Sequence, residues 1–153
     1  MNDAAEAPYM RRAIALARAR LGRTGANPAV GCVLVSEGTV IAEAATAEGG
    51  RPHAEEQALT GAGGKARGAV AYVTLEPCGE RSSGAASCAE RLIAAGVSKV
   101  VVACLDPSPL ASGRGLARLA DAGLPVETGL LAEEAQDLYL DYVKTLTAPG
   151  RLA

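Results

Sequence analysis

The chain has 153 residues, which suits one domain and is long enough to bury a core without metal or disulfide staples. Hydrophobic residues make up 49% and charged residues 21%, a balance that excludes a disordered chain. No apolar run approaches the roughly 20 residues of a membrane-spanning helix, and residues 1–10 lack the plan of a signal peptide. We therefore expect one soluble, cytoplasmic domain over residues 1–153, with no membrane partner.

Two absences narrow the classes of partner. The chain has no Phe and no Trp, and its net charge is −2 with scattered Lys and Arg. Proteins that bind single-stranded nucleic acid use stacking aromatics and a basic groove, so we expect no nucleic-acid partner. Four cysteines in a cytoplasmic chain indicate ligands, thiols or buried side chains rather than disulfides. His53 is the single histidine and must carry any imidazole chemistry.

The first half of the chain predicts a helix, a hairpin and a second helix. Apolar residues at helical spacing end at a glycine: Met10, Ile14, Ala17, Leu21 and Gly22. After a Gly/Asn/Pro loop, short apolar strands at 30–35 and 39–43 flank a turn, which predicts a hairpin. A helix is expected over residues 53–62.

The second half alternates strands with helices. Strands are predicted over 69–75, 99–104 and 126–128, and helices over 86–95, 116–122 and 131–146. The last helix has an apolar stripe of Leu131, Ala135, Leu138, Tyr142 and Leu146. A hairpin followed by alternating strands and helices predicts an α/β fold, a three-layer α/β/α sandwich around a mixed five-stranded sheet.

Three residues in this pattern have the chemistry of zinc ligands. His53 opens a predicted helix, Cys78 follows a predicted strand, and Cys88 lies near the start of the next helix. Catalytic zinc takes three imidazole, thiolate or carboxylate ligands and keeps one position open for water, whereas structural zinc is closed by four ligands. Two thiolates weaken the metal's pull on water, and positive helix N-termini at the ligands would partly offset this. We predict a catalytic zinc site.

Glu55 is the predicted proton carrier of this site. It lies two residues after His53, too close along a helix to share the metal easily, so we expect it over the open position. There it can take a proton from activated water and pass it to a leaving amine. Zinc deaminases carry H-x-E followed by P-C-x-x-C, whereas nine residues separate the two cysteines here. Cys32 and Cys104 are expected to be structural, and Glu56 a solvated neighbour.

Six motifs occur in an order that identifies a family: Asn27-Pro28-Ala29-Val30-Gly31-Cys32, Pro52-His53-Ala54-Glu55, Tyr72-Val73-Thr74-Leu75-Glu76-Pro77-Cys78, Leu92-Ile93-Ala94-Ala95-Gly96-Val97, Asp106-Pro107-Ser108-Pro109 and Gly113-Arg114-Gly115. From about residue 10 onward the chain resembles the pyrimidine deaminase domain of riboflavin biosynthesis, in the cytidine-deaminase-like superfamily. A long insert between the cysteine ligands is typical of that branch.

The resemblance implies the same zinc ligands and the same proton shuttle, together with a substrate. It implies that Asn27 contacts the pyrimidine and that Asp106 and Ser108 approach the sugar-phosphate end. The implied reaction is hydrolytic loss of the 2-amino group of a diaminopyrimidine ribosyl phosphate. Water activated at the zinc attacks the amino-bearing carbon, Glu55 protonates the departing nitrogen, and ammonia is released.

Departures from the family pattern affect the expected substrate. Thr46 stands where the family commonly has a histidine, Glu80 replaces a second histidine, and Ser108 replaces an asparagine. Arg81 corresponds to a basic residue of the insert, so we expect Thr46 and Arg81 among the substrate-binding residues. A changed substrate shell favours, as an alternative, a deaminase of a free base or nucleoside of the cytosine, cytidine or guanine type.

Two further alternatives remain open. A tRNA or DNA base deaminase is disfavoured by the charge balance, and a catalytically silent zinc-binding module is disfavoured by the presence of Glu55. Many relatives continue into a reductase domain, but this chain has no nicotinamide-binding segment. We therefore expect a separate reductase if the chain acts in the riboflavin pathway. The apolar C-terminal helix and the edge strands predict a homo-oligomer.

Overall fold

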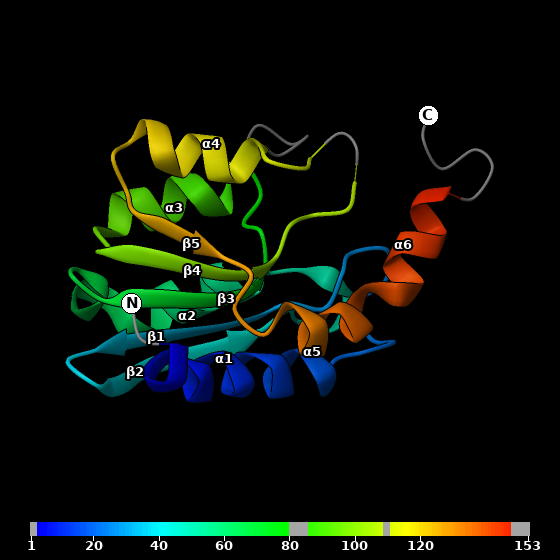
Figure 1. Cartoon of the computed structure of the whole chain (residues 1–153), viewed down its shortest axis with the longest axis horizontal. Coiled ribbons are helices and arrows are strands. Elements are labelled where there is room, and N and C mark those ends of the chain that lie inside the picture. Colours follow the sequence, from blue (N-terminus) through cyan, green and yellow to red (C-terminus); the bar gives the residue numbers. More distant parts are fainter. Residues whose placement is uncertain (1–2, 80–85, 109–110, 148–153) are drawn as a thin grey trace.

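The computed structural model describes residues 3–79, 86–108 and 111–147 (Figure 1). Its centre is a five-stranded sheet in the order β2-β1-β3-β4-β5. The strands are β1 (Gly31–Ser36), β2 (Thr39–Ala45), β3 (Val70–Leu75), β4 (Lys99–Cys104) and β5 (Val126–Thr128). β1 is antiparallel to both β2 and β3, whereas β4 is parallel to both β3 and β5. The predicted mixed five-stranded sheet and its hairpin are confirmed.

Helices cover both faces of this sheet, as Figure 1 shows. The helices are α1 (Asp3–Arg18), α2 (Ala54–Ala62), α3 (Cys88–Ala95), α4 (Arg114–Asp121), α5 (Ala132–Gln136) and α6 (Leu140–Thr147). Helices α1 and α5 lie on one face, α2 and α3 lie on the other, and α4 packs beside α3. The predicted three-layer α/β/α sandwich is therefore confirmed. Within the described part of the chain, we find no helix with the length and apolar character needed to span a membrane.

Side-chain alternation along β3 explains how one face holds two distant segments. Tyr72 donates a hydrogen bond from its hydroxyl to Glu6 of α1 at 3.1 Å. Thr74 is two residues further along the strand and so points to the same face. Its hydroxyl lies 2.7 Å from the hydroxyl of Tyr139, just after α5. The sheet face that binds α1 therefore also anchors the C-terminal segment.

The central strands form the core. β1, β3 and β4 are buried along nearly their whole length, and the run from Val100 to Ala103 is at most 2% exposed. The predicted strand at 99–104 is thus buried on both faces, as parallel strands covered by helices on both sides are.

Two predicted helices differ from those observed. The first begins at Asp3 and ends at Arg18, and Leu21 is 42% exposed in the following turn. The predicted helix over 131–146 is broken into α5, a 3₁₀ turn at Asp137–Tyr139 and α6. The break directs Leu138 and Tyr139 into the core, where both are at most 4% exposed. The burial of these two side chains and the contact of the Tyr139 hydroxyl with Thr74 favour the break over one continuous helix.

The topology brings the chemically interesting segments to one edge of the sheet. β3 and β4 are parallel, with Leu75 paired to Cys104, so their carboxyl ends meet there. The segment from Glu76 to Cys78 leaves β3 at this edge, and Asp106 follows β4. Ligand sites of open sheets containing parallel strands lie outside the carboxyl ends of those strands, which makes this edge the place to look for a site.

Candidate active site

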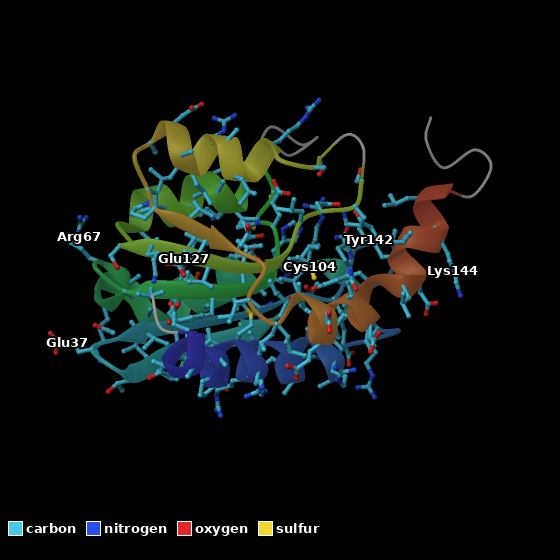
Figure 2. The ribbon with its side chains drawn as sticks, viewed as in Figure 1. Glu37, Arg67, Cys104, Glu127, Tyr142 and Lys144 are labelled. Atoms are coloured by element: carbon cyan, nitrogen blue, oxygen red, sulfur yellow. The ribbon has the colours of Figure 1, made fainter. Side chains whose placement is uncertain are left out.

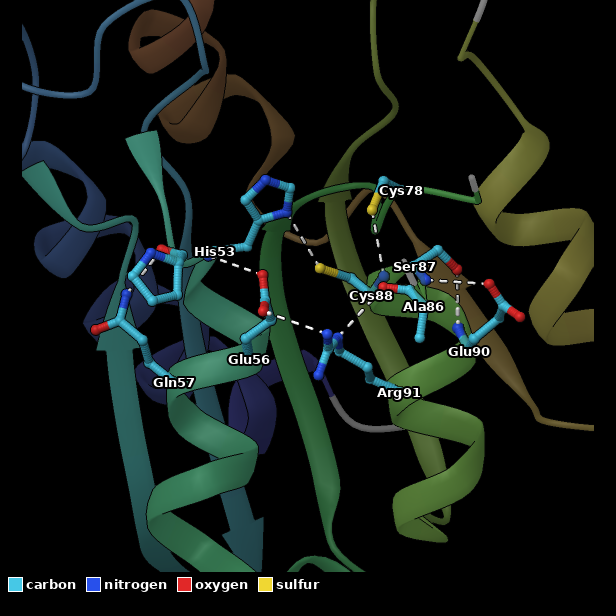
Figure 3. A network of polar contacts seen from close by, with 10 residues as sticks. His53, Glu56, Gln57, Cys78, Ala86, Ser87, Cys88, Glu90 and Arg91 are labelled. Carbon is cyan, nitrogen blue, oxygen red and sulfur yellow. Dashed lines mark hydrogen bonds and ion pairs between the residues drawn. The ribbon is translucent and has the colours of Figure 1, made fainter. Parts of the chain in front are cut away.

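Three ligand atoms converge at this edge (Figure 3). One atom each from His53, Cys78 and Cys88 lies within 4.8 Å of the other two. The His53 Nδ1 atom is 3.3 Å from the Cys88 Sγ atom. Tetrahedral zinc with Zn–N of about 2.0 Å and Zn–S of about 2.3 Å holds such atoms at about 3.5 Å from each other. The residue types and their spacing therefore fit zinc, with three protein ligands and one position left for water.

Two of these three residues lie at the start of a helix, and the third accepts a hydrogen bond from one of those helix starts. His53 is the residue that precedes α2, and Cys88 is the first residue of α3. Cys78 lies in the loop after β3 rather than at a helix start, but its sulfur accepts a hydrogen bond from the Cys88 backbone N–H at 3.2 Å. Its carbonyl oxygen accepts from Ala89 N at 3.1 Å. The positive end of α3 therefore faces both sulfurs and favours their thiolate forms.

A cavity of about 170 Å³ opens beside the ligands. Its lining residues are Asn27, Pro28, Val30, Thr46, His53, Glu55, Leu75, Glu76, Cys78, Asp106 and Tyr142. Glu55 is only 4% exposed and belongs to the first turn of α2. A carboxylate held out of water beside the metal ligands is suited to proton transfer. The cavity is smaller than the roughly 300–1,000 Å³ of pockets for drug-sized ligands, so its volume suits the reacting ring of a substrate rather than a whole nucleotide.

The side chain of Asn27 is oriented by the loop before His53. Its Nδ2 atom donates to the Gly50 carbonyl at 2.9 Å. Gly50 has a φ of 101°, and a Cβ there would lie 2.6 Å from the Thr24 carbonyl oxygen and 2.8 Å from Asn27 Nδ2. Only glycine therefore fits this close approach. The side-chain oxygen Oδ1 and the second hydrogen of Nδ2 are the Asn27 groups that can hydrogen-bond to the edge of a heterocyclic ring.

Thr46 lines the same cavity, but its hydroxyl group is used by the backbone. The Oγ1 atom accepts from Val30 N at 2.9 Å and lies 3.3 Å from the Pro28 carbonyl, to which it donates. The side chain is 2% exposed. Since the hydroxyl is engaged with backbone groups, we expect Thr46 to contribute to the shape of the cavity rather than to polar recognition.

Asp106 reaches the cavity from the segment after β4. Its Oδ1 atom accepts a hydrogen bond from Ser108 N at 2.8 Å and lies 3.4 Å from the Tyr142 hydroxyl. Ser108 is not among the residues that line the cavity, and its contact to Asp106 is made by its backbone. Arg81 and Glu80 lie outside the described residues. The structure thus brings together Asn27, Thr46 and Asp106, with Ser108 behind Asp106.

Sequence reasoning missed two residues of this cavity as functional. Glu76 is 4% exposed and accepts three backbone N–H groups: Asp106 N at 3.1 Å, Gly113 N at 3.0 Å and Leu116 N at 3.2 Å. Tyr142 reaches the cavity from α6, whereas Lys144 on the same helix points away (Figure 2). A charged residue directly after an apolar strand was a usable signal for Glu76. Tyr142 gave none, because it had a place in a regular helical stripe.

Replacement of Glu76 by Gln tests whether this carboxylate holds the segment after β4 in place. Gln offers one acceptor oxygen instead of two. At least one of the three backbone N–H groups would then face the NH₂ group of Gln, which is itself a donor. Loss of a buried partner costs about 1–3 kcal/mol of unfolding free energy. We expect that loss in urea unfolding, together with a raised KM and retained zinc. The exposed Glu37→Gln variant serves as the control, and an unchanged KM would contradict the assignment.

Asp106 is expected to make the stability of the fold depend on pH. Burial raises the pKa of its carboxyl group, with a smaller contribution from the charge of Glu76. A raised folded-state pKa favours the protonated form, so stability is lost as the pH rises through it. In metal-free protein, Asp106→Asn should therefore melt at a higher temperature than wild type at pH 7. The gain should vanish below about pH 4, where Asp106 is protonated, and an equal gain at both pH values would contradict this reasoning.

The other two cysteines have the properties of structural residues. Cys32 is fully buried in β1, and burial raises the pKa of its thiol well above the usual value. Cys104 is half-buried at the end of β4, and burial raises the pKa of its thiol too. A raised pKa disfavours the reactive thiolate. Glu56 differs from its expected role as a solvated neighbour, because it bonds to the backbone of His53 and pairs with Arg91.

Comparisons with known proteins agree with this geometry. The family model described as the cytidine and deoxycytidylate deaminase zinc-binding region matches residues 4–104. The riboflavin biosynthesis protein RibD of Aquifex aeolicus is 45% identical over 139 residues, which cover 91% of this chain and 39% of that protein. The diaminohydroxyphosphoribosylamino-pyrimidine deaminase of Buchnera aphidicola is 40% identical over 138 residues, which cover 90% of this chain and 93% of that protein.

A solved structure is similar over nearly the whole chain. It is the Thermotoga maritima diaminohydroxyphosphoribosylaminopyrimidine deaminase/5-amino-6-(5-phosphoribosylamino)uracil reductase, with a TM-score of 0.84 and 38% identity. The match covers 93% of this chain and 42% of that one, so the chain spans about two fifths of such longer relatives. These findings confirm the resemblance to riboflavin-pathway deaminases, the cytidine-deaminase-like fold and the zinc cofactor. The chain belongs to the cytidine and deoxycytidylate deaminase family, whose zinc-binding region it contains.

Proposed function

We propose that the chain is a zinc-dependent hydrolytic deaminase of an aminopyrimidine, and that its substrate is the diaminopyrimidine ribosyl phosphate of riboflavin biosynthesis. The observation that carries the proposal is that His53, Glu55, Cys78, Asn27 and Asp106 line one cavity. The 40% identical relative from Buchnera aphidicola bears the name of this deaminase and is matched over 93% of its length.

In this proposal the residues of the cavity divide the work. His53, Cys78 and Cys88 would hold the zinc. When bound, the zinc supplies Lewis-acid chemistry that lowers the pKa of water to about 7. Glu55 accepts one proton from the attacking water and delivers it to the departing nitrogen. The C–O bond forms as water adds to the amino-bearing ring carbon, and the C–N bond then breaks. One proton of the water ends on the departing nitrogen and the other on the ring nitrogen, so the products are a ring carbonyl and ammonia. Asn27 holds the ring, and Asp106 contacts the sugar end.

Ammonia release tests the proposal directly. Zinc-loaded protein is assayed with the diaminopyrimidine ribosyl phosphate, cytosine, cytidine and guanine at matched concentrations. We expect the highest kcat/KM for the riboflavin precursor. A protein that carries zinc but releases ammonia from none of the four would overturn the deaminase assignment and favour a silent zinc-binding module.

A free base or nucleoside is the second candidate substrate, and one observation favours it. Among the described residues that line the cavity, none is Lys or Arg, whereas a phosphate group calls for a cation. Arg114 lies instead beside a separate hollow with Gly79 and Arg118. Arg81→Gln separates the two readings. A raised KM for the phosphorylated substrate alone supports the nucleotide, and an unchanged KM supports a base or nucleoside.

The partners of the enzyme are also part of the proposal. Residues 1–153 would act as a single deaminase domain, with reduction carried out by a separate reductase, and we propose a cytoplasmic location. We further propose a homo-oligomer, supported by the exposed apolar side chains of Leu105, Leu140 and Val143 around one hollow. Analytical ultracentrifugation tests the oligomer, because Val143→Asp should shift a dimer or larger assembly towards the monomer.

A further inference from the structure

The two helices that carry His53 and Cys88 are joined by a pair of charged side chains (Figure 3). Glu56 lies in the first turn of α2, and its Oε1 atom accepts a hydrogen bond from the His53 backbone N–H at 3.1 Å. Its other oxygen is 3.6 Å from a guanidinium nitrogen of Arg91 on α3. The Arg91 Nε atom in turn donates to the carbonyl of Ala86 at 3.3 Å. We call this set, Glu56, Arg91 and the Ala86 carbonyl, the cross-helix bridge.

One end of the cross-helix bridge contacts a candidate metal ligand, and the other contacts the backbone two residues before another candidate ligand. Glu56 bonds to the backbone of His53 itself. Ala86 immediately precedes Ser87, the N-cap of α3, whose hydroxyl accepts from Glu90 N at 3.1 Å. Glu90 returns the contact by accepting from Ser87 N at 3.0 Å. The residue before Cys88 is therefore held both by its own helix and, through Ala86 and Arg91, by the helix that follows His53.

We propose that Glu56 and Arg91 are positioning residues for zinc binding, which hold His53 and Cys88 at the separation that the metal requires. The inference rests on the proposed zinc chemistry but not on the identity of the substrate. Groups behind the metal ligands fix their orientation, and their loss typically weakens metal binding by about 10–100-fold. Arg91 is more than one-third exposed, and exposed ion pairs are weak. A smaller loss, of about three- to tenfold, is therefore expected here.

Substitutions at both ends distinguish this role from general stabilisation. Glu56→Gln keeps an oxygen that can accept from His53 N but removes the charge that faces Arg91. Arg91→Gln removes the cation. Each variant should raise the zinc Kd by about three- to tenfold, measured by competition with a chromogenic chelator. The double variant should bind zinc no more weakly than the single variant with the higher Kd, because both substitutions break the same bridge.

Arg11→Gln is the matched control. Arg11 and Glu134 form an ion pair at the same 3.6 Å, and Arg11 lies on α1, across the sheet from the ligands. This variant should leave the zinc Kd unchanged even if it lowers the melting temperature. Cobalt-substituted protein gives a second readout, since the d–d absorption bands of the Arg91→Gln variant should shift and those of the control should not.

The outcomes are decisive in both directions. Equal zinc Kd values for wild type, Glu56→Gln and Arg91→Gln would overturn the proposal, as would additive losses in the double variant. Failure of the proposed function would show differently, as absence of zinc binding or of ammonia release in the wild-type protein itself. The two failures are therefore distinguishable within one set of measurements.

Discussion

Replacement of Glu55 by Gln is expected to lower kcat by about 10²–10⁴-fold, the usual contribution of a positioned acid–base group. Gln has nearly the same shape but cannot accept or deliver a proton. Glu55 lines the cavity beside His53 and is 4% exposed, so bulk water reaches it poorly and is not expected to replace its proton transfers. The measurement is steady-state ammonia release, with zinc content determined on the same preparation.

The zinc content separates chemistry from folding in this experiment. Glu55→Gln should bind zinc as wild type does, because the ligand atoms belong to His53, Cys78 and Cys88. Glu37→Gln, in the exposed turn between β1 and β2, is the control and should keep full activity. Wild-type turnover by Glu55→Gln would remove this residue from the proposed mechanism.

Removal of zinc should abolish activity and also destabilise the fold. Lewis-acid catalysis contributes several kcal/mol to transition-state stabilisation, which corresponds to a loss of about 10³-fold or more in rate. Free zinc at about 1,000 times its Kd adds about 4 kcal/mol to the free energy of unfolding. Treatment with a chelator should therefore stop ammonia release and lower the melting temperature, and stoichiometric zinc should restore both.

Cysteine substitutions provide the matched comparison for zinc removal. Cys88→Ala should behave as the chelated protein and should not recover when zinc is added. Cys104→Ala removes a thiol that lies outside the ligand cluster and should keep its zinc. Equal zinc loss in both variants, or full activity in chelated protein, would contradict the assignment of the ligands.

Much of the fold was predictable because the strands are short apolar runs bounded by turn residues. The run at 99–104 is such a case, since a strand covered on both faces needs no polar side. The helix predicted over 131–146 failed for a tertiary reason. Periodicity cannot show that Tyr139 turns inward to meet Thr74, a contact between residues 65 positions apart. A 3₁₀ turn at that point leaves the apolar spacing nearly unchanged.

The candidate metal ligands were predictable from chemistry, whereas the contacts of the substrate shell were not. His53, Cys78 and Cys88 are residue types that zinc prefers as ligands, and their ligand atoms lie within 4.8 Å of one another. Glu76 and Ser108 act through backbone groups, because Glu76 accepts N–H groups and Ser108 donates its own. Such contacts depend on the path of the chain. Thr46 illustrates the same limit, since its side-chain type does not reveal that its hydroxyl is bonded to the backbone.

The position of Tyr142 near the end of the sequence affects when the site is completed during synthesis. The ribosome delivers His53, Cys78 and Cys88 well before Tyr142, the wall of the cavity contributed by α6. A domain generally folds as a unit, so the cavity is completed only after α6 has been synthesised. Every candidate metal donor is therefore made before the last wall of the cavity, and the complete site forms late in the synthesis of each molecule.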